Sequence, residues 1–250
     1  MRKPSTQFIF LVALALPGIN AGAGTIILDR STLGTLLDGS AVTNNFENIQ
    51  IGIQQISFYH GVALNASTIL PAFAGVAEQG PGLVPNGVSF TALTNTGSLN
   101  INPPGFPTET DLTVTLGTAG GGGGEPAAPM FINFSTPVNA LGLELLSPGL
   151  SFLNGTNAFV VTLFAEDDTT ILETHAFDIA TPIFAGGRKF FGVSEAENIG
   201  SVRIESQTFV GIDDLTFGVA STIPEPSTLV LFSGALAGLV TVRRRSCVSA

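Results

Sequence analysis

The chain has few side chains that could act as bases near neutral pH, because His60 and His175 are its only histidines. Neither lies in a zinc-binding pattern, and the chain contains no Gly-x-Ser-x-Gly nucleophile elbow. His175 lies between Thr174 and Ala176 in a candidate strand, where a half-exposed position in a sheet is the simpler interpretation. These patterns do not favour serine or zinc hydrolase chemistry.

Paired carboxylates are a second possible chemistry, since two acids on either side of a glycosidic bond suffice to hydrolyse it. Sugar subsites, however, usually offer Trp or Tyr platforms. The chain has no Trp, and Tyr59 is its only Tyr. A secreted hydrolase with two carboxylates is therefore the last of three functional hypotheses.

Calcium binding is a further possibility for the acidic residues. Asp213 and Asp214 lie in the last candidate strand, and Glu47 lies near the first. The terminal strands of a jelly roll tend to be neighbours, so Glu47 and Asp213 are candidate ligands for Ca²⁺, which takes six to eight oxygen ligands. The alternative is that one aspartate accepts a hydrogen bond at a strand end while the other faces water. The acidic run 166–168 predicts a solvated hairpin turn.

The charge of the chain is strongly acidic. The formal net charge is −10, but between Gly24 and Thr222 there are four basic and eighteen acidic residues. Such a body repels phosphate backbones, so we expect no nucleic-acid partner. Cys247 is the only cysteine, which excludes an intramolecular disulfide and a cysteine-based zinc cluster.

The body of the chain consists of short β-branched or alternating apolar runs separated by Gly, Pro, Asn and Ser, which predicts strands. With 19 Phe available for the core, we expect an all-β fold, an antiparallel β-sandwich or jelly roll. The Gly120–Gly124 run predicts a surface loop. The expected strands are 25–28, 88–93, 112–116, 130–134, 140–146, 159–165, 171–177, 189–193, 201–206 and 211–217.

The N-terminus follows the three-part plan of a secretory signal peptide. Arg2 and Lys3 precede the apolar run 8–16, and small residues follow at 21–23. We expect cleavage after Ala23, or alternatively after Ala21. A buried N-terminal helix is the other interpretation, and it is disfavoured by the basic, apolar, small order at the start of the chain.

The C-terminus carries an uncharged segment, 228–242, followed at once by Arg243, Arg244 and Arg245. This pattern predicts a transmembrane helix with the arginines in the cytoplasm and the body outside. Fifteen helical residues rise only about 22 Å, short of the roughly 30 Å hydrocarbon core, so the segment is marginal as a permanent anchor.

Pro224, Glu225 and Pro226 stand just before the apolar segment, and the prolines keep that linker extended and accessible to a protease. A Pro-Glu-Pro motif, an apolar stretch and an arginine cluster in this order resemble the PEP-CTERM sorting signal over residues 223–246. The resemblance implies recognition by an exosortase in the inner membrane of a Gram-negative bacterium that secretes exopolysaccharide, with cleavage near Pro-Glu-Pro. An ordinary single-span anchor is the alternative.

A looser resemblance covers residues 131–218, through the runs 134–138, 159–167, 190–193 and 210–218. This series is similar to the jelly-roll bodies found upstream of PEP-CTERM tails, and 45–49 could form the matching first strand.

The sequence thus predicts a signal peptide (1–23), a β-sandwich body (24–222) and a sorting tail (223–250). The leading hypothesis is a non-enzymatic protein exported to the cell surface or exopolysaccharide matrix, with a structural or interaction role. The alternative is a calcium-dependent module that binds a glycan or another partner.

Overall fold

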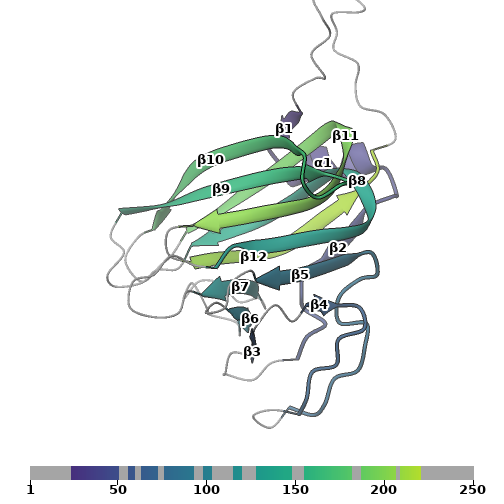
Figure 1. Ribbon diagram of the computed structural model, residues 1–250, viewed down its shortest axis with the longest axis vertical. Helices are drawn as coiled ribbons and strands as arrows, with labels where there is room; N and C mark the ends of the chain where they lie inside the picture. Colours follow the sequence, from purple (N-terminus) through teal and green to yellow (C-terminus); the bar gives the residue numbers. More distant parts are fainter. Residues whose placement is uncertain are drawn as a thin grey trace, which may run out of the picture.

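The computed structural model describes residues 24–50, 56–59, 63–72, 76–92, 98–102, 115–119, 128–147, 155–181, 187–206 and 209–220. In these ranges the regular structure consists of antiparallel β-strands and one short helix (Figure 1). The expected all-β fold is confirmed.

Within the described part of the chain, twelve strands join into one hydrogen-bonded sheet, in which the order of the main path is β10-β9-β11-β8-β12-β7-β6-β3. Strands β1 and β2 pair with β11 and β12, and β5 pairs with both β4 and β8. The strands are β1 (Thr25–Ile27), β2 (Val42–Asn44), β3 (Ile56–Tyr59), β4 (Leu64–Asn65), β5 (Val88–Ala92), β6 (Ser98–Asn102), β7 (Thr115–Ala119), β8 (Met130–Ser147), β9 (Gly155–Ala165), β10 (Ile171–Thr181), β11 (Gly187–Ser206) and β12 (Phe209–Gly218).

The long strands β8 and β11 connect the parts of this sheet. The first half of β11 pairs with the second half of β8 and with β1, whereas its second half pairs with the first half of β8 and with β9. The register shifts between Ser194 and Ser201, next to Pro137 on the facing strand. Such irregularities bend strands and let one strand serve two layers, and proline is tolerated in them because the ladder is already interrupted.

This continuity corrects the expected strand list in two places. The runs 130–134 and 140–146 are parts of β8, and the runs 189–193 and 201–206 are parts of β11. The sequence suggested breaks because polar residues and a proline interrupt the apolar runs, but the backbone remains extended through them. The structure therefore has fewer and longer strands here than expected.

Apolar side chains from both layers form one main core. Inward residues of β5 alternate strictly with half-buried ones, as expected for a strand with one covered face. Fully buried members include Phe90, Met130, Phe159 and Ile212. Phe46 packs edge-on against Phe90 with ring centroids 5.5 Å apart, so phenylalanines do supply much of the core.

The helix α1 (Arg30–Leu37) was not among the expected elements. Asp29 is its N-cap and accepts hydrogen bonds from the backbone N–H of Thr32 at 2.8 Å and from the Ser31 hydroxyl at 2.5 Å. These bonds, the Ser31 hydroxyl first, lower the pKa of the Asp29 carboxyl to about 2. Leu33 and Leu37 are fully buried in a second, smaller apolar cluster with Ile27, Ala140 and Ala220.

The expectation that 45–49 forms a first strand is wrong, because the strand is β2, just before it. Asn44 and Asn45 side chains accept hydrogen bonds from the backbone N–H groups of Phe46 and Glu47. Phe46 also has a left-handed backbone, with φ of 59°. These local hydrogen bonds turn the chain away from the sheet, although β2 does pair with the last strand, β12, as a jelly-roll-like order requires.

Several predicted features lie outside the described residues: the signal segment with Ala23, His60, the Gly120–Gly124 loop, and the whole tail with its segment 228–242. Among the residues that are described, no helix is long and apolar enough to span a membrane.

Candidate binding groove

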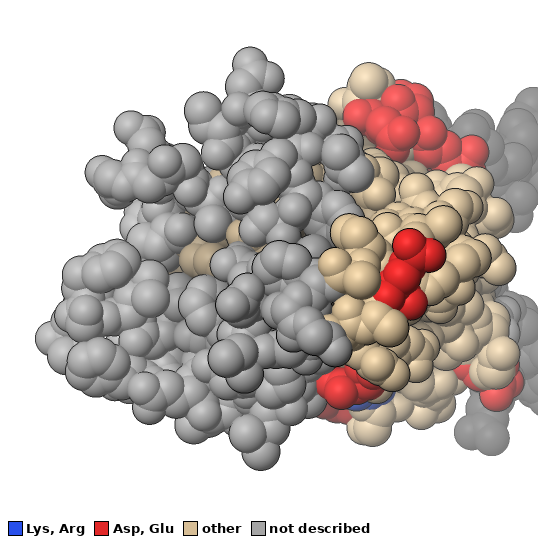
Figure 2. Space-filling model, turned by 90° about the horizontal axis from the view of Figure 1, so that it is seen from below, with Lys and Arg blue, Asp and Glu red and all other residues tan. Residues whose placement is uncertain are grey.

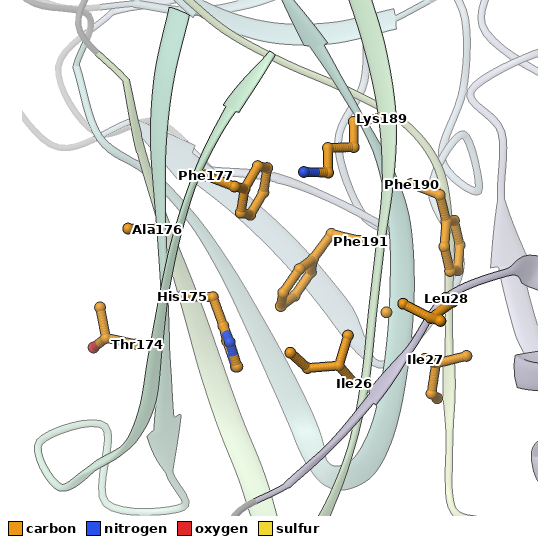
Figure 3. A pocket seen from close by; sticks show the side chains of 11 residues that line it. Ile26, Ile27, Leu28, Thr174, His175, Ala176, Phe177, Lys189, Phe190 and Phe191 are labelled. Carbon is orange, nitrogen blue, oxygen red and sulfur yellow. The ribbon is translucent and has the colours of Figure 1, made fainter.

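A groove of about 570 Å³ opens between β10, the first half of β11, and β1. Strands β10 and β11 are not hydrogen-bonded neighbours in the path of the sheet, so this groove lies between its layers. Figure 3 shows side chains from all three strands pointing toward the same space. Its lining residues are Ile26, Ile27, Leu28, Thr174, His175, Ala176, Phe177, Lys189, Phe190, Phe191 and Gly192.

Alternation along the strands decides which side chains face the groove. On β10 the positions of His175 and Phe177 share one face, and on β11 the positions of Lys189 and Phe191 share one. Phe190 points to the opposite side of β11, against the small apolar cluster that contains Leu33. The two rows therefore face each other across the space between the layers.

Two stacked phenylalanines, Phe177 and Phe191, line the inner wall of the groove, and Phe159, which is not part of the lining, stacks on Phe177. Phe177 stacks on Phe191 with centroids 6.0 Å apart and on Phe159 with centroids 6.2 Å apart, with ring planes within 15° in both pairs. The Lys189 ammonium lies 4.6 Å from the centre of the Phe177 ring, close enough for a cation–π interaction. The result is an apolar wall with one positive group at its rim.

His175 is half-buried, which confirms the expectation that it is a partly exposed sheet residue. Its ring lies 5.3 Å from that of Phe191, and its Nε2 lies 2.9 Å from Oε2 of Glu173. The imidazole is thus held between an aromatic ring and a carboxylate. This arrangement suits positioning and polar recognition.

At one end of the groove, two acidic residues come together beside the start of β1. Oε1 of Glu173 accepts a hydrogen bond of 2.6 Å from the backbone N–H of Gly24. Glu195 is only 3% exposed, and its Oε1 has no hydrogen-bond partner. Burial, then the charge of Glu173, a hydrogen bond with Glu173 and the charge of Glu197 raise the pKa of Glu195 to about 7.

The groove can bind a ligand chemically through its apolar wall, with Lys189 and His175 as polar contacts at its edge. Ile26 of β1 and Leu28 just after this strand are large apolar residues that are 54% and 84% exposed. Because β1 forms one wall, the shape of the groove depends on how firmly the three-residue strand β1 is held against β11.

The predicted calcium ligands differ in their surroundings. Asp213 is 1% exposed in β12, whereas Glu47 is exposed in the turn after β2. Oδ1 of Asp213 accepts a 2.7 Å hydrogen bond from the N–H of Asp214, whose φ is 51°. Among the described residues, no group of three or more His, Cys, Asp or Glu could hold a metal ion. Calcium binding at Glu47 and Asp213 stays a prediction.

The carboxylates next to Asp213 already have a cation from the chain itself. Arg30 of α1 lies 3.3 Å from Oε1 of Glu144 and 3.2 Å from Oδ2 of Asp214, and it donates to the Asp214 carbonyl at 3.1 Å. Its guanidinium also lies over the Phe190 ring, 5.6 Å from the centroid. This Arg30 cluster (Arg30, Glu144, Asp214) fastens the helix to the sheet.

The acidic run 166–168 forms the exposed turn between β9 and β10, as expected. Asp167 accepts hydrogen bonds from the N–H groups of Thr169 and Thr170 and from the Thr170 hydroxyl. These bonds, the Thr170 hydroxyl first, hold the pKa of the Asp167 carboxyl well below its usual range. The face in Figure 2 carries acidic side chains in several separate places and little basic surface between them.

The sequence interpretation did not single out Glu173, Glu195 or the phenylalanine stack. Alternation along 173–177 gives a signal for one row of the groove, but nothing local indicates that 189–195 faces it. The sorting-tail residues Pro224, Glu225, Pro226, Arg243, Arg244 and Arg245 lie outside the described ranges, so their roles stay predictions.

Comparison with known proteins supports the interpretation of the tail. Residues 222–245 match the model of the PEP-CTERM protein-sorting motif, which confirms the resemblance drawn from Pro-Glu-Pro, the apolar segment and the arginines. The motif marks the chain as an exported protein of the kind sorted by an exosortase. No curated protein matches the chain in sequence.

Solved structures share only distant similarity with the body. A DUF4465 family protein from Bacteroides caccae has 11% identity and a TM-score of 0.41, covering 71% of this chain and 98% of that one. An arabinose-bound GH51 α-L-arabinofuranosidase has 10% identity and a TM-score of 0.36, covering 51% of this chain and 23% of that one. The CBM22-1 and GH10 modules of a Clostridium thermocellum xylanase, complexed with xylohexaose, have 13% identity and a TM-score of 0.34, covering 54% and 27%. The chain matches only about a quarter of the length of each of these two enzymes.

Proposed function

We propose that this protein is exported, processed at both ends, and delivered to the cell surface or exopolysaccharide matrix, where it acts by binding rather than by catalysis. The match of residues 222–245 to the sorting motif carries the proposal. The N-terminal order of basic, apolar and small residues supports export, with cleavage after Ala23. The exosortase and the inner membrane are the partners of the precursor, and exopolysaccharide is the proposed surrounding of the product.

The test is the intact mass of the protein from its native host, compared with a variant in which 224–226 are Ala-Ala-Ala. Sorting predicts that the native form lacks both end segments, whereas the variant retains its tail and stays in the inner-membrane fraction. Recovery of an uncut tail from both would leave the segment as a simple anchor and overturn the exosortase step. A cytoplasmic protein with an intact N-terminus would overturn export itself.

The groove supports the binding part of the proposal, because it joins an apolar wall to Lys189 and His175 at its edge. We propose it as the surface that contacts matrix material. Binding of the purified protein to the host's exopolysaccharide should weaken in Leu28→Ser and Lys189→Ala, both exposed groove positions, and should persist in Ile171→Ser, an exposed position outside it. Equal binding by all three variants would exclude the groove. Loss of binding on chelation would favour the calcium-dependent alternative.

A further inference from the structure

The acidic pair Glu173 and Glu195 is unevenly supplied with basic groups: Nε2 of His175 lies 2.9 Å from Oε2 of Glu173, whereas Oε1 of Glu195 has no hydrogen-bond partner. Only 3% of the surface of Glu195 is exposed. An ionised carboxylate in this position lacks the compensation that buried charges require. The buried oxygen therefore points to a positively charged donor that the uncut chain does not supply.

Gly24 lies against both carboxylates. Its nitrogen is 2.6 Å from Oε1 of Glu173, and a Cβ on residue 24 would lie 2.0 Å from Oε1 of Glu195. A side chain on residue 24 would displace the Glu195 carboxylate from the position that it occupies beside Gly24. The backbone nitrogen and a Cβ on residue 24 would be bonded to the same Cα. A donor on this nitrogen is therefore within reach of both Glu173 and Glu195.

Position 24 is also the residue that follows the expected signal cleavage site. Hydrolysis of the Ala23–Gly24 peptide bond consumes one water and yields a carboxylate on Ala23 and an α-amino group on Gly24. An amide nitrogen has one N–H to donate, whereas an α-ammonium has three and a full positive charge. The cut would therefore create a cation at the atom that already contacts Glu173.

We propose that the α-ammonium of Gly24, formed by signal cleavage after Ala23, binds between the carboxylates of Glu173 and Glu195 and fastens β1 to the body. This inference rests on the export step of the proposed function. The ammonium would hold the residue immediately before the three-residue strand β1, whose partners are Gly192, Val193 and Ser194. Since β1 lines the groove, cleavage would complete the groove wall. A cut after Ala21 would leave an amide at Gly24 and no such contact.

The charged and titratable groups around this nitrogen come from two strands: Glu173 and His175 of β10, and Glu195 and Glu197 of β11. Before cleavage, their carboxylates repel each other as pH rises. After cleavage, the ammonium favours the ionised form of Glu195. The two forms should therefore respond in opposite ways to the removal of this one carboxylate.

The experiment compares two full-length chains that begin at Gly24 and at Gly22, each released from an N-terminal fusion and kept in detergent. Both have a free α-ammonium and the same net charge, but only the first places it at the carboxylates. Each has a single lysine, Lys189, which serves as the internal reference amine. We expect the α-amine of the Gly24 chain to react with an acylating reagent about tenfold more slowly relative to Lys189, the effect of a pKa about one unit higher.

The variant Glu195→Gln gives a second readout at pH 8. It should lower the melting temperature of the Gly24 chain, which loses an ion-pair partner, and raise that of the Gly22 chain, which loses a repulsive charge. Equal acylation in the two chains, or the same sign of the Glu195→Gln shift in both, would overturn the proposal. The acylation comparison needs no substitution, so it stands even where the variant fails to fold.

Sequencing the N-terminus of the protein from its native host separates this inference from the export step. A native start at Gly24 with equal acylation of the two recombinant chains would leave export intact and reject the docking. An uncut native chain would reject the export step, while the recombinant pair still reports whether the site can bind an α-ammonium.

Discussion

Two regions of the molecule each bring a pair of carboxylates together, and they differ in the source of positive charge. Glu144 and Asp214 share the guanidinium of Arg30, with N–O distances of 3.3 Å and 3.2 Å. Glu173 and Glu195 have the amide of Gly24 beside them, Glu173 also contacts Nε2 of His175 at 2.9 Å, and the pKa of Glu195 is raised to about 7. The first pair therefore has its positive partner within the folded chain.

A folded chain can thus supply the cation for one pair of carboxylates from its own side chains and depend on proteolytic processing for the cation at another pair. Arg30 belongs to helix α1, and its ion pairs fasten this helix to the sheet. Those contacts therefore form whenever the body folds. The Glu173 and Glu195 pair lies where a peptide bond is expected to be cut. Variants that alter charge at each site can therefore test whether the difference is real.

The largest effect is expected at Glu195 in a chain that retains residues upstream of Gly24. Its pKa is raised from 4.5 to about 7, so the stability associated with the protonated form is complete below about pH 4.5 and is lost as pH rises through about 7. Glu195→Gln should be about 2–3 kcal/mol more stable than the unmodified chain at pH 8 and similar to it at pH 4.5. Urea unfolding at both pH values measures this difference.

The matched control for that experiment is Glu197→Gln, an exposed acidic neighbour on the same strand. It should change the free energy of unfolding by less than about 0.5 kcal/mol at either pH. A stabilisation by Glu195→Gln that is the same at both pH values would contradict the electrostatic explanation, because it would not follow the titration of the carboxyl.

The second effect tests the complete pair. Arg30→Met keeps an apolar stem over Phe190 but removes the cation from Glu144, whose side chain is 17% exposed. We expect a loss of about 1–2 kcal/mol in the free energy of unfolding, since a partly buried carboxylate loses its partner. Thermal and urea unfolding at pH 7 provide the measurement.

Arg203→Met is the control, because Arg203 also has an ion pair, with Glu205 at 3.0 Å, and a phenylalanine ring near its guanidinium. Both side chains of that pair are more than a third exposed, so its loss should cost less than about 1 kcal/mol. Equal losses in the two variants would show that burial of Glu144 does not set the difference.

The sequence predicts the fold better than it predicts either acidic pair. Alternating or β-branched runs identified β5, β9, β10 and β12, because one periodic pattern decides each of these strands. The helix α1 was missed, although Asp29 as an N-cap and the apolar spacing 33, 36 and 37 are typical helix signals. Eight residues give too short a pattern to compete with the surrounding strand signals.

The acidic pairs depend on contacts that no local pattern encodes. Glu173 and Glu195 lie on β10 and β11, which do not pair with each other, and Glu195 lies within the register shift of β11. Arg30 and Asp214 are in contact in the structure but are 184 residues apart in the sequence. In contrast, Asp167 was correctly placed in a turn, since its partners Thr169 and Thr170 are adjacent in the sequence.

A third, smaller effect concerns Asp213, which is buried and caps the irregularity where Asp214 turns left-handed. Asp213→Ala should lose about 1 kcal/mol or slightly more, because the Asp214 N–H loses an acceptor in the protein interior. Asp213→Asn retains an acceptor oxygen and should lose less. Thermal unfolding of the unmodified chain with added calcium and with chelator tests the predicted metal site at Glu47 and Asp213. A calcium-dependent rise that Asp213→Asn lacks would establish the predicted metal site.

The smallest effect is expected for Asp167, whose carboxylate is compensated by N–H and O–H donors instead of a cation. Its pKa is lowered, so its contribution to stability is present above the ordinary carboxyl pKa and is lost as pH falls through the lowered value. Asp167→Asn keeps an acceptor for Thr169 and Thr170, whereas Asp167→Ala removes it. We expect only a slight fall in the melting temperature for Asp167→Ala at pH 7, a smaller one for Asp167→Asn, and a reduction of both at pH 2, where part of the contribution is already lost. A fall of the same size at pH 2 would mean that ionisation of Asp167 does not stabilise the turn. The N–H and O–H donors of this loop would then contribute no electrostatic stability to the carboxylate, in contrast to the guanidinium of Arg30.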